Sequence, residues 1–107
     1  MAKRSHRKKD REELREEVFR PSPYLGYDHL TLADYLMDRE AYGLAESELR
    51  RAVWLNPYEV RFKIRLAWCL LKLGRTTEGR EWIDRALRQK PGDEEALRMQ
   101  RLLSSKP

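Results

Sequence analysis

The first nine residues contain one of two groups of basic side chains that could do chemistry. Five lysines and arginines fall there with no acid among them, namely Lys3, Arg4, Arg7, Lys8 and Lys9. Such a cluster attracts phosphate groups through charge and counterion release, which predicts contact with nucleic acid or an anionic lipid surface. The competing interpretation is a solvated terminus, because five charges without interleaved aromatic rings specify no ligand.

The second group lies in the middle of the chain. Arg61, Arg65 and Lys72 are separated by four and seven residues, which places them on nearly one side of a helix, close to Trp68. A stripe of this kind fits an acidic segment that carries an apolar anchor. The alternative interpretation is that Trp68 belongs to the core and that the arginines are merely solvated.

Patterns typical of catalysis or metal binding are missing from the sequence. The two histidines, His6 and His29, are far apart and have no cysteine cluster beside them, so no zinc-ligand spacing exists. There is no glycine-rich phosphate loop, no nucleophile elbow and no carboxylate pair in an apolar setting. The single cysteine, Cys69, cannot form an internal disulfide and is expected to be a buried thiol. We therefore expect a non-enzymatic protein that holds no cofactor and no metal.

Length and composition point to one small domain. The chain has 107 residues, of which 40% are apolar and 38% charged, and its mean hydropathy is −0.88. No run approaches the roughly 18 apolar residues of a membrane span, and the basic N-terminus lacks the apolar core of a secretory signal. We therefore expect a cytoplasmic protein. Its net charge of +5 resides entirely in residues 1–9, because the acids and bases of the remainder balance.

A period of 34 residues runs through the sequence. Pro23, Pro57 and Pro91 are spaced by 34, and the first two are followed by tyrosine. Several small or apolar residues coincide at the same offset: Leu32 with Leu66, Ala33 with Ala67, Leu36 with Leu70, Leu49 with Ile83, and Ala52 with Ala86. A repeated unit of this length indicates stacked copies of one supersecondary element.

Apolar spacing predicts two helices in each unit. The first helix of the first unit has a common face, made of Leu32, Ala33, Leu36 and Met37. Asp28 is its expected N-cap. The second helix is expected to end near Asn56, because a residue that precedes proline disfavours the helical conformation.

Three further segments have less regular patterns. The alternation of apolar and polar residues over 60–66 is typical of a half-buried strand, but the apolar run continues to Leu73, which favours a helix. A last helix is expected to begin at Asp93. Residues 10–20 are a short helix candidate, with Leu14, Val18 and Phe19 apolar, and one hypothesis makes them the second helix of an incomplete leading unit.

The units resemble the tetratricopeptide repeat (TPR), a helix–turn–helix motif with a large and then a small residue in its first helix, a glycine before the turn and a closing proline. The second unit matches at Leu66, Ala67, Gly74, Gly79, Ile83, Ala86 and Pro91. The first matches at Leu32, Ala33, Tyr42, Ala45, Leu49, Ala52 and Pro57, but has Glu40 where the turn glycine is usual. The small residues are expected where neighbouring helices cross closely. The resemblance covers residues 26–103 and implies an all-α fold, a short TPR-like α-solenoid of antiparallel helix pairs with a C-terminal capping helix.

The expected organisation has three parts. Residues 1–9 form a basic tail that we expect to be disordered, 10–25 a short helix and linker, and 26–105 the TPR-like domain. The two repeats and the capping helix then fall at about 26–59, 60–93 and 94–104. Two units are few for a solenoid, so terminal helices, self-association into a homo-oligomer or a permanent partner must cover its ends.

The resemblance also implies a function, that of a protein–protein interaction module acting as an adaptor or chaperone-like scaffold. In that family the first helices line a concave groove that receives a peptide or helix of a partner. Carried over by register, the groove residues are Tyr27, Asp34, Met37, Asp38, Arg61, Arg65, Trp68 and Lys72. The carboxylate clamp that some members use for chaperone tails is not matched, because Leu30 and Asp34 stand where a lysine and an asparagine are expected. The alternative function is a nucleic-acid- or ribosome-associated protein that uses the basic tail.

The other two tryptophans have different expected environments. Trp82 lies beside Ile83 on the presumed inner face and is expected in the core. Trp54 follows the core residues Ala52 and Val53 and is expected nearer the surface, where an exposed tryptophan would mark a contact patch.

Overall fold

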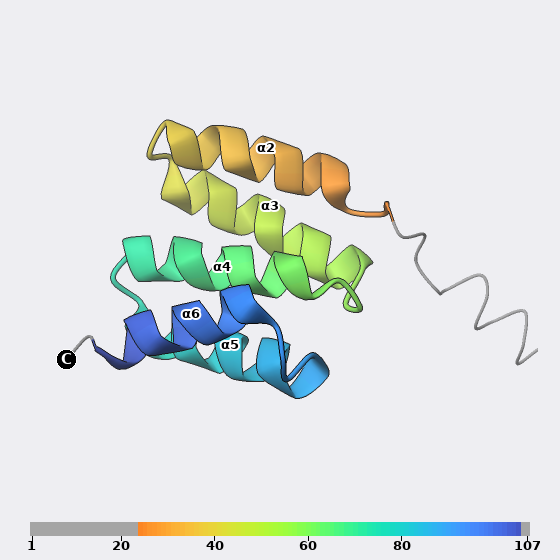
Figure 1. The fold of residues 1–107 in the computed structure, drawn as a ribbon. Coiled ribbons are helices and arrows are strands. Elements are labelled where there is room, and N and C mark those ends of the chain that lie inside the picture. The colour runs from red at the N-terminus through yellow and green to blue at the C-terminus, as the bar shows by residue number, and fades with distance from the viewer. Residues whose placement is uncertain (1–23, 106–107) are drawn as a thin grey trace, which may run out of the picture.

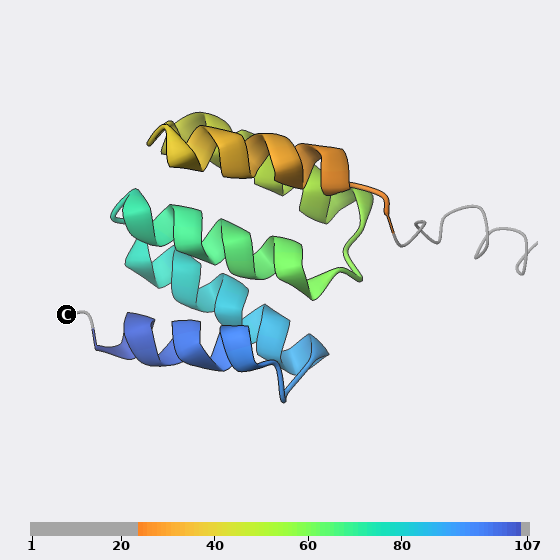
Figure 2. The same cartoon turned by 45° about the horizontal axis from the view of Figure 1, so that its top comes forward.

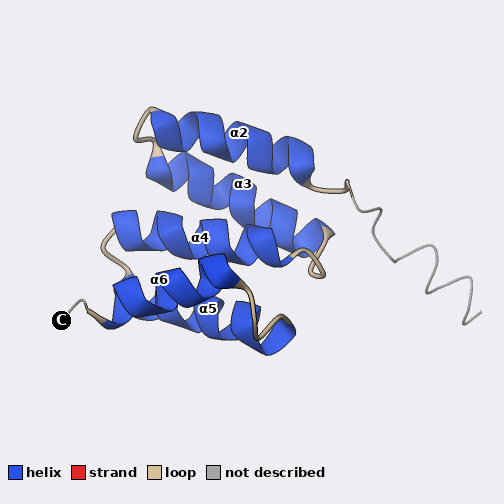
Figure 3. Cartoon of the chain, in the orientation of Figure 1, coloured by secondary structure: helices blue, strands red, loops and turns tan. Residues whose placement is uncertain are grey.

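The computed structural model describes residues 24–105 (Figure 1). The basic tail and the helix predicted at 10–20 lie outside this range. The described part consists of five helices joined by short loops, with no strand (Figure 3). In chain order they are α2 (Tyr27–Asp38), α3 (Tyr42–Leu55), α4 (Val60–Lys72), α5 (Thr76–Gln89) and α6 (Glu94–Ser104).

The helices stack in chain order. α2 packs on α3, α3 on α4, α4 on α5 and α5 on α6, and α4 also contacts α6 directly. Figure 2 shows α2, α4 and α6 on the side nearer the viewer, with α3 and α5 behind them. This arrangement confirms the predicted all-α solenoid of antiparallel helix pairs followed by a last helix. The segment whose alternation is typical of a strand lies within α4.

Two apolar clusters form the core, and α4 contributes to both. One is shared by α2, α3 and α4 around Leu49 and Phe62, and the other by α4, α5 and α6 around Ile64 and Ile83. The predicted small residues lie at the helix crossings: Ala33, Ala45, Ala52, Ala67 and Ala86 are fully buried. Gly79 is tighter still, because a Cβ atom there would lie 3.2 Å from the carbonyl oxygen of Ala67. A larger side chain at these positions would separate the helices.

Two details of the first helix depart from what its sequence pattern suggests. Leu32 is 44% exposed, whereas Leu66, its counterpart in α4, is fully buried. Leu32 has no helix on its outer side within the described residues, but Leu66 belongs to the cluster that α3 and α4 share. The predicted N-cap Asp28 is also wrong. The helix begins at Tyr27 after Gly26, which has φ 91°.

The turn between the two helices of each unit has the same backbone geometry. Gly74 adopts φ 79°, and Glu40, which stands in its place in the first unit, adopts φ 60°. The following residue closes both turns, since Ala41 N–H donates to Leu36 O and Arg75 N–H to Leu70 O, each at 2.8 Å. A left-handed conformation is easy for glycine and costly for glutamate, so the first unit keeps the turn in spite of its residue.

Acidic side chains cap the starts of α4 and α6. Glu59 accepts a hydrogen bond from Arg61 N–H at the start of α4, at 3.1 Å. Asp93 accepts one from Ala96 N–H at the start of α6, at 2.9 Å. Each carboxylate satisfies a backbone donor that has no partner within the helix. The last helix therefore begins just after Asp93, as the sequence predicts.

Candidate functional site

Helices α2, α4 and α6 present two adjacent hollows, one on each side of α4. The α4–α6 hollow has a volume of about 400 Å³ and is lined by Ile64, Arg65, Trp68, Glu95, Arg98, Met99 and Leu102. The α2–α4 hollow has a volume of about 360 Å³ and is lined by Asp34, Met37, Asp38, Tyr42, Arg65 and Trp68. Arg65 and Trp68 belong to both, so they form a ridge between an apolar hollow and a polar one.

Arg65 is held by carboxylates from both neighbouring helices. Its Nη1 lies 2.9 Å from Asp34 Oδ1 of α2, and its Nε lies 3.7 Å from Glu95 Oε1 of α6. The side chain is 35% exposed, so solvent screens both ion pairs and each contributes little to stability. The charge of Arg65 is nevertheless balanced within the fold. The stripe on α4 is therefore less basic than its sequence indicates.

Trp68 is half-buried, which combines the two interpretations of the sequence. Part of its indole packs against the core cluster that α4, α5 and α6 share, and the remainder lines both hollows. The ammonium of Lys72 lies 5.0 Å from the centroid of the indole ring, a cation–π contact. Trp68 thus joins the core to the surface of the candidate site.

Tyr27 and Arg61 lie apart from the other predicted residues, because neither lines a hollow. The hydroxyl of Tyr27 donates to Glu59 Oε2 at 2.5 Å, and this hydrogen bond raises the pKa of Tyr27 because it stabilises the protonated phenol. Arg61 is exposed at the start of α4. The structure therefore brings together Asp34, Met37, Asp38, Arg65 and Trp68, with Lys72 stacked on Trp68.

The residues of α6 are part of the candidate site, although the sequence did not predict them there. Glu95, Arg98, Met99 and Leu102 form one wall of the α4–α6 hollow. They follow Arg61, Ile64, Arg65 and Trp68 by 34 residues. The repeat register could have identified them, because α6 stands where the first helix of a third unit would stand. Helix α6 therefore lines the candidate site in addition to packing against the last helix pair.

Cys69 of α4 is fully buried. Its Sγ donates to Tyr42 O at 3.0 Å, and burial raises the pKa of the thiol to about 11. At neutral pH it is therefore a neutral thiol, whereas nucleophilic cysteines act as thiolates. This agrees with the predicted buried thiol.

Within residues 24–105, no histidine, cysteine, aspartate and glutamate side chains gather in a group of three or more that could hold a metal ion. No helix in the same range is long and apolar enough to cross a membrane.

Comparison with known proteins agrees with the geometry. The sequence model of the tetratricopeptide repeat family matches residues 30–94. Repeats of this family generally form scaffolds that mediate protein–protein interaction. No curated protein matches the sequence. The matched segment contains most of α2 and all of α3, α4 and α5, with both turns and the α4 ridge, and spans more than half of the 107 residues. The chain therefore belongs to the tetratricopeptide repeat family.

Proposed function

We propose that this protein is a non-enzymatic adaptor or chaperone-like scaffold that holds a short peptide or helix of a partner protein across α2, α4 and α6. The observation that carries the proposal is the pair of hollows that meet at Arg65 and Trp68. Binding sites commonly combine an apolar pocket with a few convergent polar groups. Here the apolar and polar parts lie side by side on one face.

The α4–α6 hollow supplies the anchor point. Ile64, Trp68, Met99 and Leu102 give it apolar walls, and Leu102 remains 37% exposed at its edge. Its volume of about 400 Å³ lies within the range of ligand pockets. A leucine, methionine or aromatic side chain of the partner fits this description.

The charges around the hollows indicate which residues flank the anchor. Arg98 and Lys72 form no ion pair among the described residues, so they are available to a carboxylate of the partner. A uniformly acidic segment is less suitable, because Asp34, Asp38 and Glu95 also face the hollows. We therefore propose a segment that carries a large apolar residue with one or two acids beside it.

Photo-crosslinking tests this assignment directly. A benzophenone amino acid in place of Leu102, introduced in the source cells, should give a discrete crosslinked adduct whose partner peptide mass spectrometry identifies. The matched control is the same amino acid in place of Leu44, an apolar residue of α3 that is 63% exposed and lines neither hollow. Identical adducts from both positions would contradict the groove.

The peptide identified in this way permits a quantitative test. Leu102→Asp places a charge in the apolar hollow and should weaken binding of the peptide by at least about tenfold. Leu44→Asp should leave the affinity unchanged. Titration by fluorescence anisotropy measures both, and circular dichroism checks that both variants keep the helical fold. Equal affinities for the two variants would refute the proposed site.

A further inference from the structure

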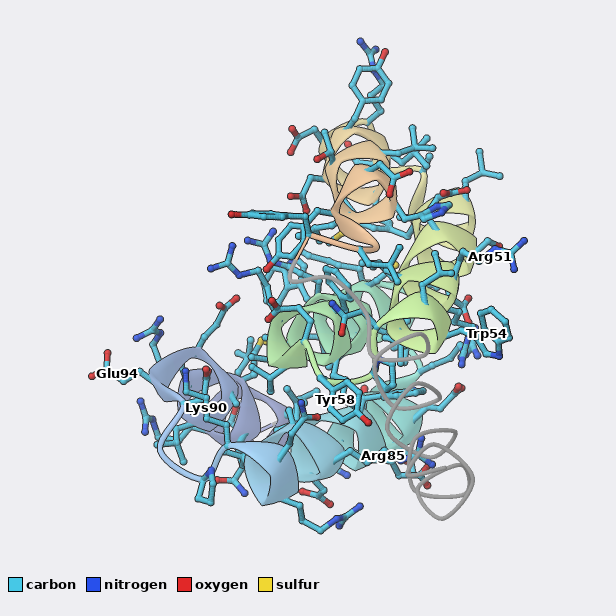
Figure 4. The ribbon with its side chains drawn as sticks, turned by 90° about the vertical axis from the view of Figure 1, so that its right-hand side faces the viewer. Arg51, Trp54, Tyr58, Arg85, Lys90 and Glu94 are labelled. Atoms are coloured by element: carbon cyan, nitrogen blue, oxygen red, sulfur yellow. The ribbon has the colours of Figure 1, made fainter. Side chains whose placement is uncertain are left out.

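Exposed aromatic rings and arginines lie on the second helices and on the turn that follows α3, away from the hollows. Trp54 is 74% exposed and Tyr58 is 73% exposed. Figure 4 shows Arg51 and Trp54 on α3 at the right of the view, Tyr58 at the turn before α4 and Arg85 on α5 nearer its middle, and α6 at the left. We call these four residues the aromatic–arginine face. None of them lines either hollow of the proposed groove.

The two arginines lie at the same repeat position on neighbouring helices. Arg51 and Arg85 are 34 residues apart. Arg50 Nη2 of α3 lies 2.5 Å from Glu78 Oε2 of α5, so the two second helices are adjacent. Among the described residues neither Arg51 nor Arg85 forms an ion pair, and Arg85 lies 4.6 Å from the centroid of the Trp82 ring. Trp82 itself is half-buried between the two core clusters. Both guanidinium groups are free to meet anions.

The turn that carries Tyr58 is held firmly. Gln89 Nε2 donates to Tyr58 O at 2.7 Å, and the buried ammonium of Lys63 donates to Pro57 O at 2.5 Å and to Gln89 Oε1 at 2.6 Å. The phenol ring therefore projects into solvent from an ordered backbone. A group that stacks on it pays little for ordering the turn.

The buried side chain of Lys63 lies near enough to Arg85 for the two charges to repel each other. Lys63 is only 8% exposed, and its pKa is lowered first by burial and then by the charge of Arg85. Two acids of α5, Glu81 and Asp84, are exposed beside Arg85 in sequence. These two acids limit the size of the cationic region, which can therefore bind a few phosphates but does not form a long basic track.

We propose that the aromatic–arginine face binds single-stranded nucleic acid. Bases stack on Trp54 and Tyr58, and neighbouring phosphates meet Arg51 and Arg85. Exposed rings beside cations are the combination that binds single strands with little sequence preference. A peptide of acidic residues alone would satisfy the arginines but would leave both rings in water, so the nucleic acid is the better fit. The proposal is independent of the peptide groove.

The test uses the full chain and a fluorescein-labelled oligouridylate of about 12 nucleotides, a length suited to one small binding surface. Anisotropy titrations at about 0.05 M and 0.2 M salt give the affinity and its salt dependence. Trp54→Ala should weaken binding at least about fivefold through lost stacking. The double variant Arg51→Glu/Arg85→Glu should weaken it further and reduce the slope of log K against log salt by about 1.4, the value for two phosphates.

Matched variants separate this face from the general charge of the protein. Leu44→Ala removes another exposed apolar residue of α3, and Arg39→Glu/Arg101→Glu makes the same change in net charge at exposed positions elsewhere. Both should change the affinity by less than about threefold. Equal losses in the charge-matched pair, or binding that disappears only when residues 1–9 are deleted, would overturn the proposal.

Two further outcomes would also overturn it. One is the absence of oligouridylate binding at the lower salt concentration. The other is equal competition by a polyglutamate peptide of the same charge, which would assign the face to an acidic protein. Circular dichroism confirms folding of each variant, and the exposure of Trp54 makes loss of the fold by its replacement unexpected.

Discussion

The first helices α2 and α4 have the same motif but very different environments. α4 buries seven residues, from Phe62 to Leu70, whereas α2 buries only Leu30 and Ala33. α4 packs against α3, α5 and α6, but α2 has one substantial neighbour, α3, in the described structure. The motif thus determines where a helix lies in the unit, and its neighbours determine how much of it is buried.

Two pairs of residues at the same repeat position show this difference most clearly. Leu32 is 44% exposed and Leu66 is fully buried, while Tyr35 is 53% exposed and Cys69 is fully buried. Burial of apolar area is the main stabilising contribution of such positions. The same substitution should therefore have unequal effects in the two helices.

The largest difference is expected for truncation of the two leucines. Leu66→Ala should reduce the free energy of unfolding by about 3 kcal/mol, because it removes buried methyl groups and leaves a cavity. Leu32→Ala should cost less than about 1 kcal/mol, since much of that side chain already contacts water. Urea denaturation followed by circular dichroism measures both. Equal losses would show that another part of the chain or a second copy covers Leu32 in solution.

The second pair is tested by thiol chemistry. Because burial raises the pKa of Cys69 to about 11, the thiol should react with a disulfide reagent at about pH 8 only after unfolding. Raising the pH from about 9 through 11 should lower the free energy of unfolding, by about 2 to 3 kcal/mol at most, because the unfolded thiol loses its proton first. In Cys69→Ala/Tyr35→Cys the new thiol should react at once. Rapid labelling of folded wild-type protein would contradict the burial of Cys69.

The two turns allow a further comparison, in which the two substitutions should change the free energy of unfolding by smaller amounts and in opposite directions. Glu40→Gly should raise the free energy of unfolding by about 1 kcal/mol, because glycine adopts φ 60° without strain. Gly74→Ala should lower it by about the same amount. A Cβ atom at Gly74 would meet nothing within 4 Å, so this loss reports backbone conformation alone. Urea denaturation measures both variants, and equal signs for the two would refute the equivalence of the turns.

The sequence predicted what depends on local pattern and missed what depends on neighbours. The 34-residue period was enough to predict the helix pairs. The turn at Glu40 has the same geometry as the turn at Gly74, although it lacks glycine, because the surrounding helices fix it. The exposure of Leu32 does not follow from its place on the apolar face, since periodicity identifies such a face but not whether a helix covers it.

The site was predicted to a similar degree. Register identified Asp34, Met37, Arg65 and Trp68, which the structure brings to the two hollows. It did not indicate that Arg65 is shared by Asp34 and Glu95, because that depends on side-chain directions across three helices. Met99 and Leu102 were not predicted, because a capping helix is not expected to line the groove.

The smallest effect is expected at the ion pairs that join α3 to the start of α5. Glu78 accepts from Arg50 and from Arg75, and both arginines also pair with Glu46 of α3. At the same repeat position in the first unit stands Leu44, which is 63% exposed. A carboxylate between two guanidinium groups is stabilised in its charged form, so the pKa of Glu78 is lowered from its usual value of about 4.5.

The sign of the pH dependence follows from that shift. The stability contributed by Glu78 is present above about pH 4.5 and is lost as the pH falls through its lower folded pKa. Glu78→Gln should therefore lower the melting temperature slightly at neutral pH and low salt, and less at about 1 M salt, which screens exposed charges. Leu44→Gln should show no such salt dependence. Thermal unfolding by circular dichroism measures both variants, and a salt-independent loss in Glu78→Gln would mean that side-chain packing, rather than charge, links the two second helices.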